Sequence, residues 1–254
     1  SVRRHCPQIE VAVGDNATAL VFRLLKPLSE SDQKLLREFL QQHQLQGFIQ
    51  SGGPKSITAI ESSYPALFYT LPSYDLKLTF APTDFVQING EVNRQIVDQV
   101  LTLLGLSKTD RVLDLFCGLG NFTLPLATQS EHVSAVEFDQ ALLDKLKFNA
   151  EQNQLANIET FKTDLNQTIN HQDWASHKYD AALIDPPRSG ADSVCTYLVK
   201  KPVSRIVYVS CHPASLARDA KTLVDGGYQL VAAGVADMFP QTAHVESMAL
   251  FERR

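Results

Sequence analysis

The stretch that decides the fold reads Arg111-Val-Leu-Asp-Leu-Phe-Cys-Gly-Leu-Gly-Asn-Phe-Thr-Leu-Pro-Leu-Ala127. An apolar run leads into a turn bracketed by two glycines, and an apolar-periodic segment follows. This pattern predicts a strand, a loop and a helix. Gly118 and Gly120 permit a tight turn with a close backbone approach, and the free N–H groups of the next helix point into the same space. We therefore expect a ligand over this turn.

Two ligand classes compete for this position, the dinucleotides and S-adenosylmethionine. A dinucleotide fingerprint needs a third small residue where the helix packs on the strand, and this chain has Phe122 there. Phe122 therefore favours S-adenosylmethionine over NAD. The next expected strand ends at Glu137, whose carboxylate can accept both ribose hydroxyls. Because acids at this point do so in either cofactor class, Glu137 does not separate the two.

Length and composition indicate a globular protein. The chain has 254 residues, of which 44% are hydrophobic and 20% are charged, so it can bury a sizeable core in one or two domains. It has no apolar run of about 18 residues and no hydrophobic signal core at its start. We therefore expect a cytoplasmic protein without a membrane partner.

Cysteine spacing and charge limit the kinds of site. The four cysteines show no metal-ligand spacing and are too few for a disulfide scaffold, so we expect reduced thiols and no metal site. The formal charge of -5 argues against strong electrostatic binding of nucleic acid by this chain alone. Any affinity for RNA must come from a small basic patch on this chain or from another domain or protein.

Residues 1–80 are expected to form a small α+β lobe, because β-rich runs there alternate with one helix. The β-rich runs are 8–13, 17–24, 47–50, 56–61 and 76–80. The helix should begin at Ser29, with Asp32 three residues on approximating a capping box. Its expected apolar face contains Leu35, Leu36, Phe39 and Leu40.

Residues 81–254 are expected to form a second, larger domain. A helical pattern runs from Val92 to Leu104, and from Arg111 onward strands alternate with helices. The expected strands are 111–115, 132–137, 158–162, 179–184, 205–209, 229–235 and 247–251. Such alternation predicts a doubly wound, mostly parallel sheet with helices on both faces. Ligands then bind outside the carboxyl ends of the strands, at the topological switch point.

The fourth of these strands is followed by Asp185-Pro-Pro-Arg-Ser-Gly190. Two prolines stiffen this turn and hold Asp185 and Arg188 in fixed relation, facing the substrate position. The alternative is a turn whose acid only caps a helix and whose arginine is solvated. Amino-methylating enzymes of this fold carry an aromatic residue after the prolines. Arg188 at that position points away from an exocyclic amine as the target.

Cys211 closes the fifth strand, and Pro213 is suited to begin the next helix. Near a helix N-terminus, the helix dipole favours the thiolate. A free cysteine is more often a small buried hydrophobe. The position at an exposed strand end, opposite the glycine turn and beside Asp185, nevertheless favours a nucleophile. Glu246 opens the last strand, where a glutamate is usually solvated.

Five motifs together resemble the RNA uracil-C5 methyltransferases, most closely the bacterial enzymes that act on 23S rRNA. They are Phe85-Val-Gln87, Leu113-Asp-Leu-Phe-Cys-Gly-Leu-Gly-Asn-Phe-Thr, Asp185-Pro-Pro-Arg, Ser210-Cys-His-Pro and His244-Val-Glu-Ser. The resemblance covers the whole chain. It implies the Rossmann-like, doubly wound sheet of an S-adenosylmethionine-dependent methyltransferase beside a small N-terminal α+β lobe. The implied reaction methylates carbon 5 of a uridine in 23S rRNA and releases S-adenosyl-L-homocysteine.

The resemblance also implies a role for each matching residue. Cys211 is the nucleophile, and Glu246 is the base. Asp185 and Arg188 lie where the family meets the target uracil, and Phe85 belongs to the same substrate site. The S-adenosylmethionine pocket is implied to contain Gln87, Phe116, Asn121, Glu137, Asp164 and Asp185, with Gly118 of the glycine turn.

The chain departs from the family in two respects. His212 stands where the family usually has asparagine after the nucleophile. Members of the most similar type also carry an N-terminal TRAM domain for RNA and cysteines for an iron-sulfur cluster, and neither is seen in this sequence. Cys6 has no partner at ligand spacing. We therefore expect a fragment of a longer enzyme, in which any cluster belongs to the missing part.

Three alternatives remain open. A methyltransferase that acts on tRNA uracil would share every motif. A catalytically silent RNA-binding module would have the same fold, but intact Cys211 and Glu246 argue against it. A dehydrogenase is disfavoured by Phe122 and by the reactive-cysteine position. The sequence indicates no obligate protein partner.

Overall fold

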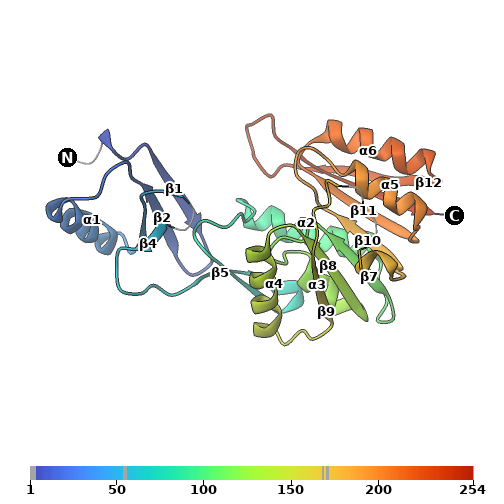
Figure 1. Ribbon diagram of the computed structural model, residues 1–254, viewed down its shortest axis with the longest axis horizontal. Helices are drawn as coiled ribbons and strands as arrows, with labels where there is room; N and C mark the ends of the chain where they lie inside the picture. Colours follow the sequence, from blue (N-terminus) through green and yellow to red (C-terminus); the bar gives the residue numbers. More distant parts are fainter. Residues whose placement is uncertain (1–3, 54–55, 168, 170–171, 254) are drawn as a thin grey trace. The chain divides into compact units, whose positions relative to one another are not determined.

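The computed structural model describes residues 4–53, 56–167, 169 and 172–253 (Figure 1). Contacts divide the chain into two compact units. The first comprises Ser1–Thr70 and Lys77–Ile88, and the second comprises Leu71–Leu76 and Asn89–Arg254. The sequence analysis put the boundary after residue 80 and so assigned 81–88 to the second domain, whereas their contacts assign them to the first unit.

The first unit contains a sheet in the order β1-β2-β3-β4, with one helix, α1. Their bounds are Gln8–Val13 for β1, Thr18–Arg23 for β2, Glu30–Gln42 for α1, Gln46–Gln50 for β3 and Ile57–Ala59 for β4. Strands β2 and β3 are parallel, so the chain crosses over between them through α1, while β1 and β4 pair antiparallel with their neighbours. The predicted α+β character of this region is confirmed.

Helix α1 begins where the sequence predicts. The Asp32 N–H donates to Ser29 Oγ at 3.1 Å, which satisfies one of the free donors at the helix start. The predicted apolar face is wrong in part, because Leu35 is 64% exposed and Phe39 is 44% exposed. Only Leu36 and Leu40 of that face pack into the small core of this unit. The helix therefore buries a narrower stripe than its apolar residues suggest.

A second, two-stranded sheet consists of β5 (Leu67–Leu71) and β6 (Leu76–Phe80), joined by the 3-10 turn Pro72–Tyr74. The sequence analysis predicted β6 and missed β5. Its Leu-Phe-Tyr-Thr-Leu composition is typical of a strand, and Pro72 marks its end.

The second unit begins with α2 (Gly90–Leu104), capped by Asn89. A seven-stranded sheet follows in the order β12-β13-β11-β10-β7-β8-β9 within the described residues. The other elements are β7 (Arg111–Leu115), α3 (Thr123–Gln129), β8 (His132–Glu137), α4 (Gln140–Gln152), β9 (Ile158–Lys162), β10 (Ala181–Ile184), α5 (Asp192–Lys200), β11 (Arg205–Ser210), α6 (Pro213–Asp225), β12 (Tyr228–Ala236) and β13 (Glu246–Arg253). Each predicted strand of this domain is present.

Most strands of this sheet are parallel, as predicted. The five strands from β9 to β11 pair parallel, and β13 runs antiparallel between β11 and β12. The chain starts at β7 and proceeds outward in both directions, so the topological switch point lies between β7 and β10. Ligands of doubly wound sheets bind at the carboxyl ends of the strands there.

Helices cover both faces of the sheet. Successive side chains of a strand point to opposite faces. Tyr208 of β11 lies in the main core with residues of α5 and α6, whereas the next residue, Val209, faces a pocket lined by α2. Helices α5 and α6 lie side by side beside β11 and β12 (Figure 1). In the part of the chain that the structure describes, none of the helices is both long enough and apolar enough to cross a membrane.

Candidate active site

In the glycine turn after β7, one glycine borders free space and the other is packed against a neighbouring side chain. Gly118 and Gly120 both have left-handed backbones, with φ of 55° and 104°. A Cβ atom at Gly118 would meet nothing within 4 Å, whereas one at Gly120 would overlap Leu124 of α3. Phe116 before the turn also has a positive φ, of 66°. Gly120 thus lets the turn pack on its own helix, and Gly118 leaves room over the turn.

Glu137 ties this turn to the end of β8. Its Oε2 accepts from the Gly118 N–H at 3.2 Å, and its Oε1 accepts from the N–H groups of Phe138 and Asp139 at 2.7 and 3.0 Å. Three backbone donors therefore orient a half-buried carboxylate beside the open space over Gly118. This is a suitable acceptor for hydroxyl groups of a ligand.

Two further side chains, those of Asn121 and Asp114, form hydrogen bonds around the turn. Asn121 exchanges reciprocal amide hydrogen bonds of 2.9 Å with Asn93 of α2, so the amide of Asn121 anchors the turn to that helix. Buried Asp114 accepts from Thr123 Oγ1 at 2.5 Å, and its Oδ1 has no hydrogen-bond partner among the described residues. Burial raises the pKa of Asp114 to about 7. The open space over Gly118, beside the Glu137 carboxylate, fits a ligand that carries hydrogen-bond donors.

Cys211 and Glu246 meet at the carboxyl end of β11. The antiparallel register pairs Ser210 with Ser247, so the residues next to this pair, Cys211 and Glu246, lie at the same end. Ser247 Oγ donates to the Ser210 carbonyl at 3.0 Å and fixes this end of the pair. Glu246 is 6% exposed, and Cys211 is half-buried. The structure thus brings together two residues that lie far apart in the sequence.

Asp185 and Arg188 complete this cluster. Burial, together with the nearby charges of Glu246 and Asp114, raises the pKa of Asp185 to about 8. Burial also raises the pKa of the Cys211 thiol, with Glu246 and Asp185 adding to the shift and the positive charge of Arg188 opposing it. In the free protein, burial and the two acids therefore oppose the thiolate that the helix dipole was expected to favour. The positive charge of Arg188 is what opposes this rise in the pKa of Cys211.

His212 takes over the capping of α6. Its Nδ1 accepts from the Ser215 N–H at 3.3 Å, and Pro213 follows at the first helical position. Asparagine caps a helix through the same kind of bond. The departure at His212 therefore leaves the start of α6, directly after the cysteine, intact.

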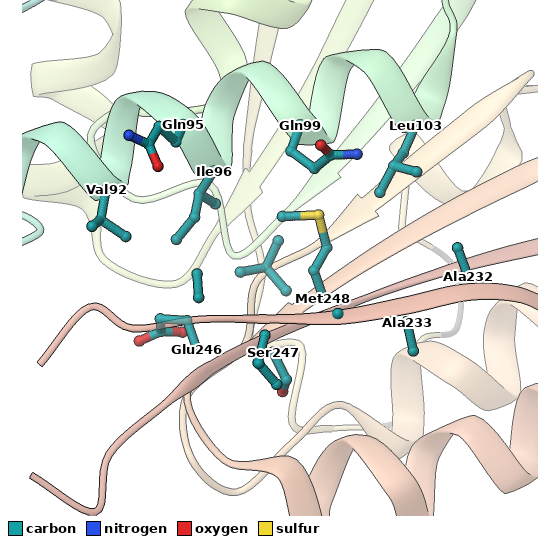
Figure 2. Close-up of a pocket in the computed structure, with 14 residues that line it drawn as sticks. Val92, Gln95, Ile96, Gln99, Leu103, Ala232, Ala233, Glu246, Ser247 and Met248 are labelled. Carbon is teal, nitrogen blue, oxygen red and sulfur yellow. The ribbon is translucent and has the colours of Figure 1, made fainter. Parts of the chain in front are cut away.

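A pocket of about 350 Å³ adjoins Glu246 (Figure 2). One wall is a face of α2 that includes Val92, Ile96 and Gln99, and the other wall consists of strands β11 to β13. Figure 2 shows Met248 projecting from β13 toward α2. This largely apolar surrounding desolvates Glu246, whose pKa is raised by burial. The sequence analysis missed this pocket, because most of its lining residues come from segments without a motif.

Three predicted site residues are not brought to this cluster by the described contacts. Phe85 and Gln87 belong to the first unit, and Phe85 is 78% exposed. Asp164 follows β9, and its carboxylate accepts from the Asn166 N–H and from Gln167 Nε2, bonds that lower its pKa. The roles of these three residues stay predictions.

All four cysteines are free thiols. Over the described ranges, no three His, Cys, Asp or Glu side chains converge as metal ligands would.

Solved structures share this fold. The tRNA (uracil-54, C5)-methyltransferase of Pyrococcus abyssi, in complex with S-adenosyl-L-homocysteine, superposes with a TM-score of 0.74 over 95% of this chain and 58% of that chain, at 23% identity. The strand order and the glycine turn define the Rossmann-like fold of S-adenosylmethionine-dependent methyltransferases.

Sequence comparison then gives the family. The model of the tRNA (uracil-5-)-methyltransferase family matches residues 17–254, and the chain belongs to this family. It is 47% identical to the 23S rRNA (uracil(1939)-C(5))-methyltransferase RlmD of Xanthomonas campestris pv. campestris (strain 8004), over 99% of this chain and 57% of that protein. Identity to RlmD of Cupriavidus necator is also 47%, over 100% of this chain and 59% of that protein. The chain thus spans less than two thirds of the length of these relatives.

Proposed function

We propose that this chain is the catalytic part of an enzyme that methylates carbon 5 of a uridine in 23S rRNA, using S-adenosylmethionine and a covalent cysteine-uracil intermediate. The observation that carries the proposal is the convergence of Cys211, Glu246, Asp185 and Arg188 at the carboxyl edge of the sheet. Family membership supports the reaction class, and the 47% identity to RlmD supports rRNA as the substrate.

The glycine turn would hold the cofactor. Glu137 would accept the ribose hydroxyls, Gly118 would give the ligand room, and Phe116, Asn121 and Asp164 would border the pocket. When bound, S-adenosylmethionine supplies an electrophilic methyl group for carbon 5 and leaves as S-adenosyl-L-homocysteine. Gln87 and Asp185 complete the proposed set.

Cys211 would activate the uracil. Carbon 5 is too poor a nucleophile by itself, so the thiolate adds to carbon 6 and pushes electron density onto the ring as an enolate. Because the pKa of Cys211 is raised in the free protein, its proton must be removed first. Arg188 favours the thiolate and would also stabilise the enolate oxygen. The target base must leave its stack to reach this edge of the sheet, and Phe85 would contact it.

Glu246 would finish the reaction. After methylation, carbon 5 still carries its hydrogen, and the Glu246 carboxylate takes this proton. The electron pair of the broken C–H bond re-forms the ring double bond as the sulfur leaves carbon 6. Burial raises the pKa of Glu246, which makes its carboxylate a stronger base than an exposed glutamate. Acting on rRNA, the enzyme would work in the cytoplasm.

The test combines the substrate with two variants. Unmodified 23S rRNA should accept labelled methyl groups and unmodified tRNA should not. Cys211→Ala should abolish transfer. Glu246→Gln should transfer the methyl but stall before elimination, so a labelled protein-RNA adduct should survive denaturing electrophoresis and vanish when Cys211 is also replaced. RNA containing 5-fluorouridine should trap the unmutated protein, since fluorine cannot leave as a cation.

His244→Gln is the matched control, because His244 is exposed two residues from Glu246. It should turn over normally. Normal turnover of Glu246→Gln without an adduct would show that another group is the base, and slow turnover of His244→Gln would then identify His244 as that group. Transfer to tRNA rather than rRNA would favour the alternative substrate, and no adduct with either RNA would favour a catalytically silent module.

A further inference from the structure

A buried carboxylate on α6 holds the loop that carries Arg188. Asp219 is fully buried, and its Oδ2 accepts from the Ala191 N–H and from the Tyr208 hydroxyl, both at 2.6 Å. Ala191 directly follows the loop 185–190 and precedes α5. One end of the loop is thereby fixed to a helix that begins just after Cys211.

Arg218 adds a second tie to the same loop. Its Nε and Nη2 donate to Asp219 Oδ1 at 2.8 and 2.6 Å, and Nη2 also donates to the Ser189 carbonyl at 2.9 Å. The guanidinium therefore bridges the buried acid and the loop backbone. Its planar fork is required, because a lysine could not make these bonds in one geometry.

Gly190 shows how closely the loop lies on α6. Its φ is +82°, and a Cβ there would overlap the Arg218 guanidinium and the Asp219 carboxylate. Only glycine permits this approach. Arg218 and Asp219 thus bond the backbone at Ser189 and Ala191, and Gly190 between them packs against the same two side chains.

A role in stability alone would not explain why charged residues, Arg218 and Asp219, stand at these positions. Burying the Asp219 carboxylate is costly, and a well-packed apolar residue of similar size often stabilises a protein as much or more. The pair here bonds the backbone directly after Arg188, on the loop that leaves β10 beside the end of the neighbouring parallel strand β11, where Cys211 lies. The polar pair holds that loop in place through hydrogen bonds to its backbone, which an apolar pair could not form.

We propose that Arg218 and Asp219 are positioning residues, which fix the loop 185–191 to α6 and so keep Arg188 beside the Cys211 sulfur. The inference rests on the proposed function of Cys211. If the ties are removed, Arg188 spends less time near the sulfur. The thiol then faces Glu246 from β13 and Asp185 from the loop, with its neighbour His212, without the opposing charge.

The test measures the thiol itself. The full chain is alkylated with iodoacetamide over a range of pH, and mass spectrometry follows the Cys211 peptide. In Arg218→Lys, which retains the charge and loses the fork, the profile should move to higher pH, with Cys211 reacting at least roughly threefold more slowly near neutral pH. Asp219→Asn should act in the same direction. Methyl transfer should slow in both variants.

Tyr208→Phe is the matched control. It removes one hydrogen bond to Asp219 and leaves both loop ties, so it should lower the melting temperature without moving the alkylation profile. Arg188→Gln should move the profile as Arg218→Lys does.

A wild-type profile in folded Arg218→Lys, or in Arg188→Gln, would overturn the proposal. Because Arg218 is half exposed, its lysine variant should fold even if Asp219→Asn does not. Absence of methyl transfer by the unmutated chain would overturn the proposed function instead, and the alkylation comparison would still decide the positioning role.

Discussion

Replacement of Glu137 by glutamine tests how the end of β8 would hold a cofactor. The carboxylate accepts N–H groups of Gly118, Phe138 and Asp139 at 3.2, 2.7 and 3.0 Å. In Glu137→Gln the amide oxygen can still serve Phe138 and Asp139, but the NH₂ group then faces the Gly118 N–H, and donor meets donor. The change therefore removes the charge and disturbs the turn with little change in shape.

The size of the effect follows from the bond that is lost. A hydrogen bond to a charged acceptor contributes about 1.5 to 3 kcal/mol. If Glu137 accepts a ribose hydroxyl, its loss should weaken the Kd for S-adenosyl-L-homocysteine by about 10- to 150-fold. The free variant should also melt at a lower temperature, because the Gly118 N–H loses its acceptor.

Calorimetric titration with S-adenosyl-L-homocysteine measures this Kd. Asp139→Asn is the control, because it removes the same charge from an exposed residue two positions away. Its side chain caps α4 by accepting from the Ala141 N–H at 2.8 Å, and asparagine caps equally well. The control should bind normally. Equal affinity of Glu137→Gln and the unmutated chain, or equal weakening by Asp139→Asn, would refute a specific contact with Glu137.

Three further predictions concern stability. The pKa of Asp185, about 8, lies above its unfolded value, so its protonated form stabilises the fold at low pH and this contribution is lost as the pH rises toward 8. Asp185→Asn should therefore melt at a higher temperature than the unmutated chain at pH 8 and differ less at pH 5, and parallel pH profiles of the two proteins would contradict this. Both Gly118→Ala and Gly120→Ala should lose about 1 to 2 kcal/mol of stability in urea unfolding, because their backbones are left-handed. Gly120→Ala should lose more, since its new Cβ also overlaps Leu124, and the reverse order of stabilities would contradict this packing. Gly118→Ala should instead weaken cofactor binding. His212→Asn should melt like the unmutated chain and His212→Ala should lose about 1 kcal/mol in urea unfolding, and equal stability of the two variants would show that the cap contributes nothing.

Local chemistry and periodicity predicted much of the fold. Ser29 caps its helix as expected, because capping depends on residues only three positions apart. The strands of the second unit follow from apolar runs bounded by turns. The prediction failed for Leu35 and Phe39, which are apolar yet exposed. A helical period identifies the residues that can be buried, whereas tertiary contacts decide which of them are.

The active site was only partly predictable. Motifs at strand ends indicated Cys211 and Asp185, since parallel strands bring their carboxyl ends to one edge. The raised pKa of Cys211 was missed, because it depends on burial and on the distant Glu246. The Arg218 and Asp219 ties were missed as well. Their partners lie in a loop near position 190, and one sequence carries no signal for that pairing.

The position of β13 has a consequence for biosynthesis. This strand follows β11 and β12 in the chain but lies between them in the sheet, so until it pairs, β12 has no neighbour in the sheet and β11 is paired only with β10. Pairing across such sequence distances is slow, and until it occurs the nucleophile's strand has an open edge. The same strand delivers Glu246 to Cys211. A nascent chain on the ribosome thus acquires its thiol before it acquires its base, and the reactive pair is assembled only when the sheet closes.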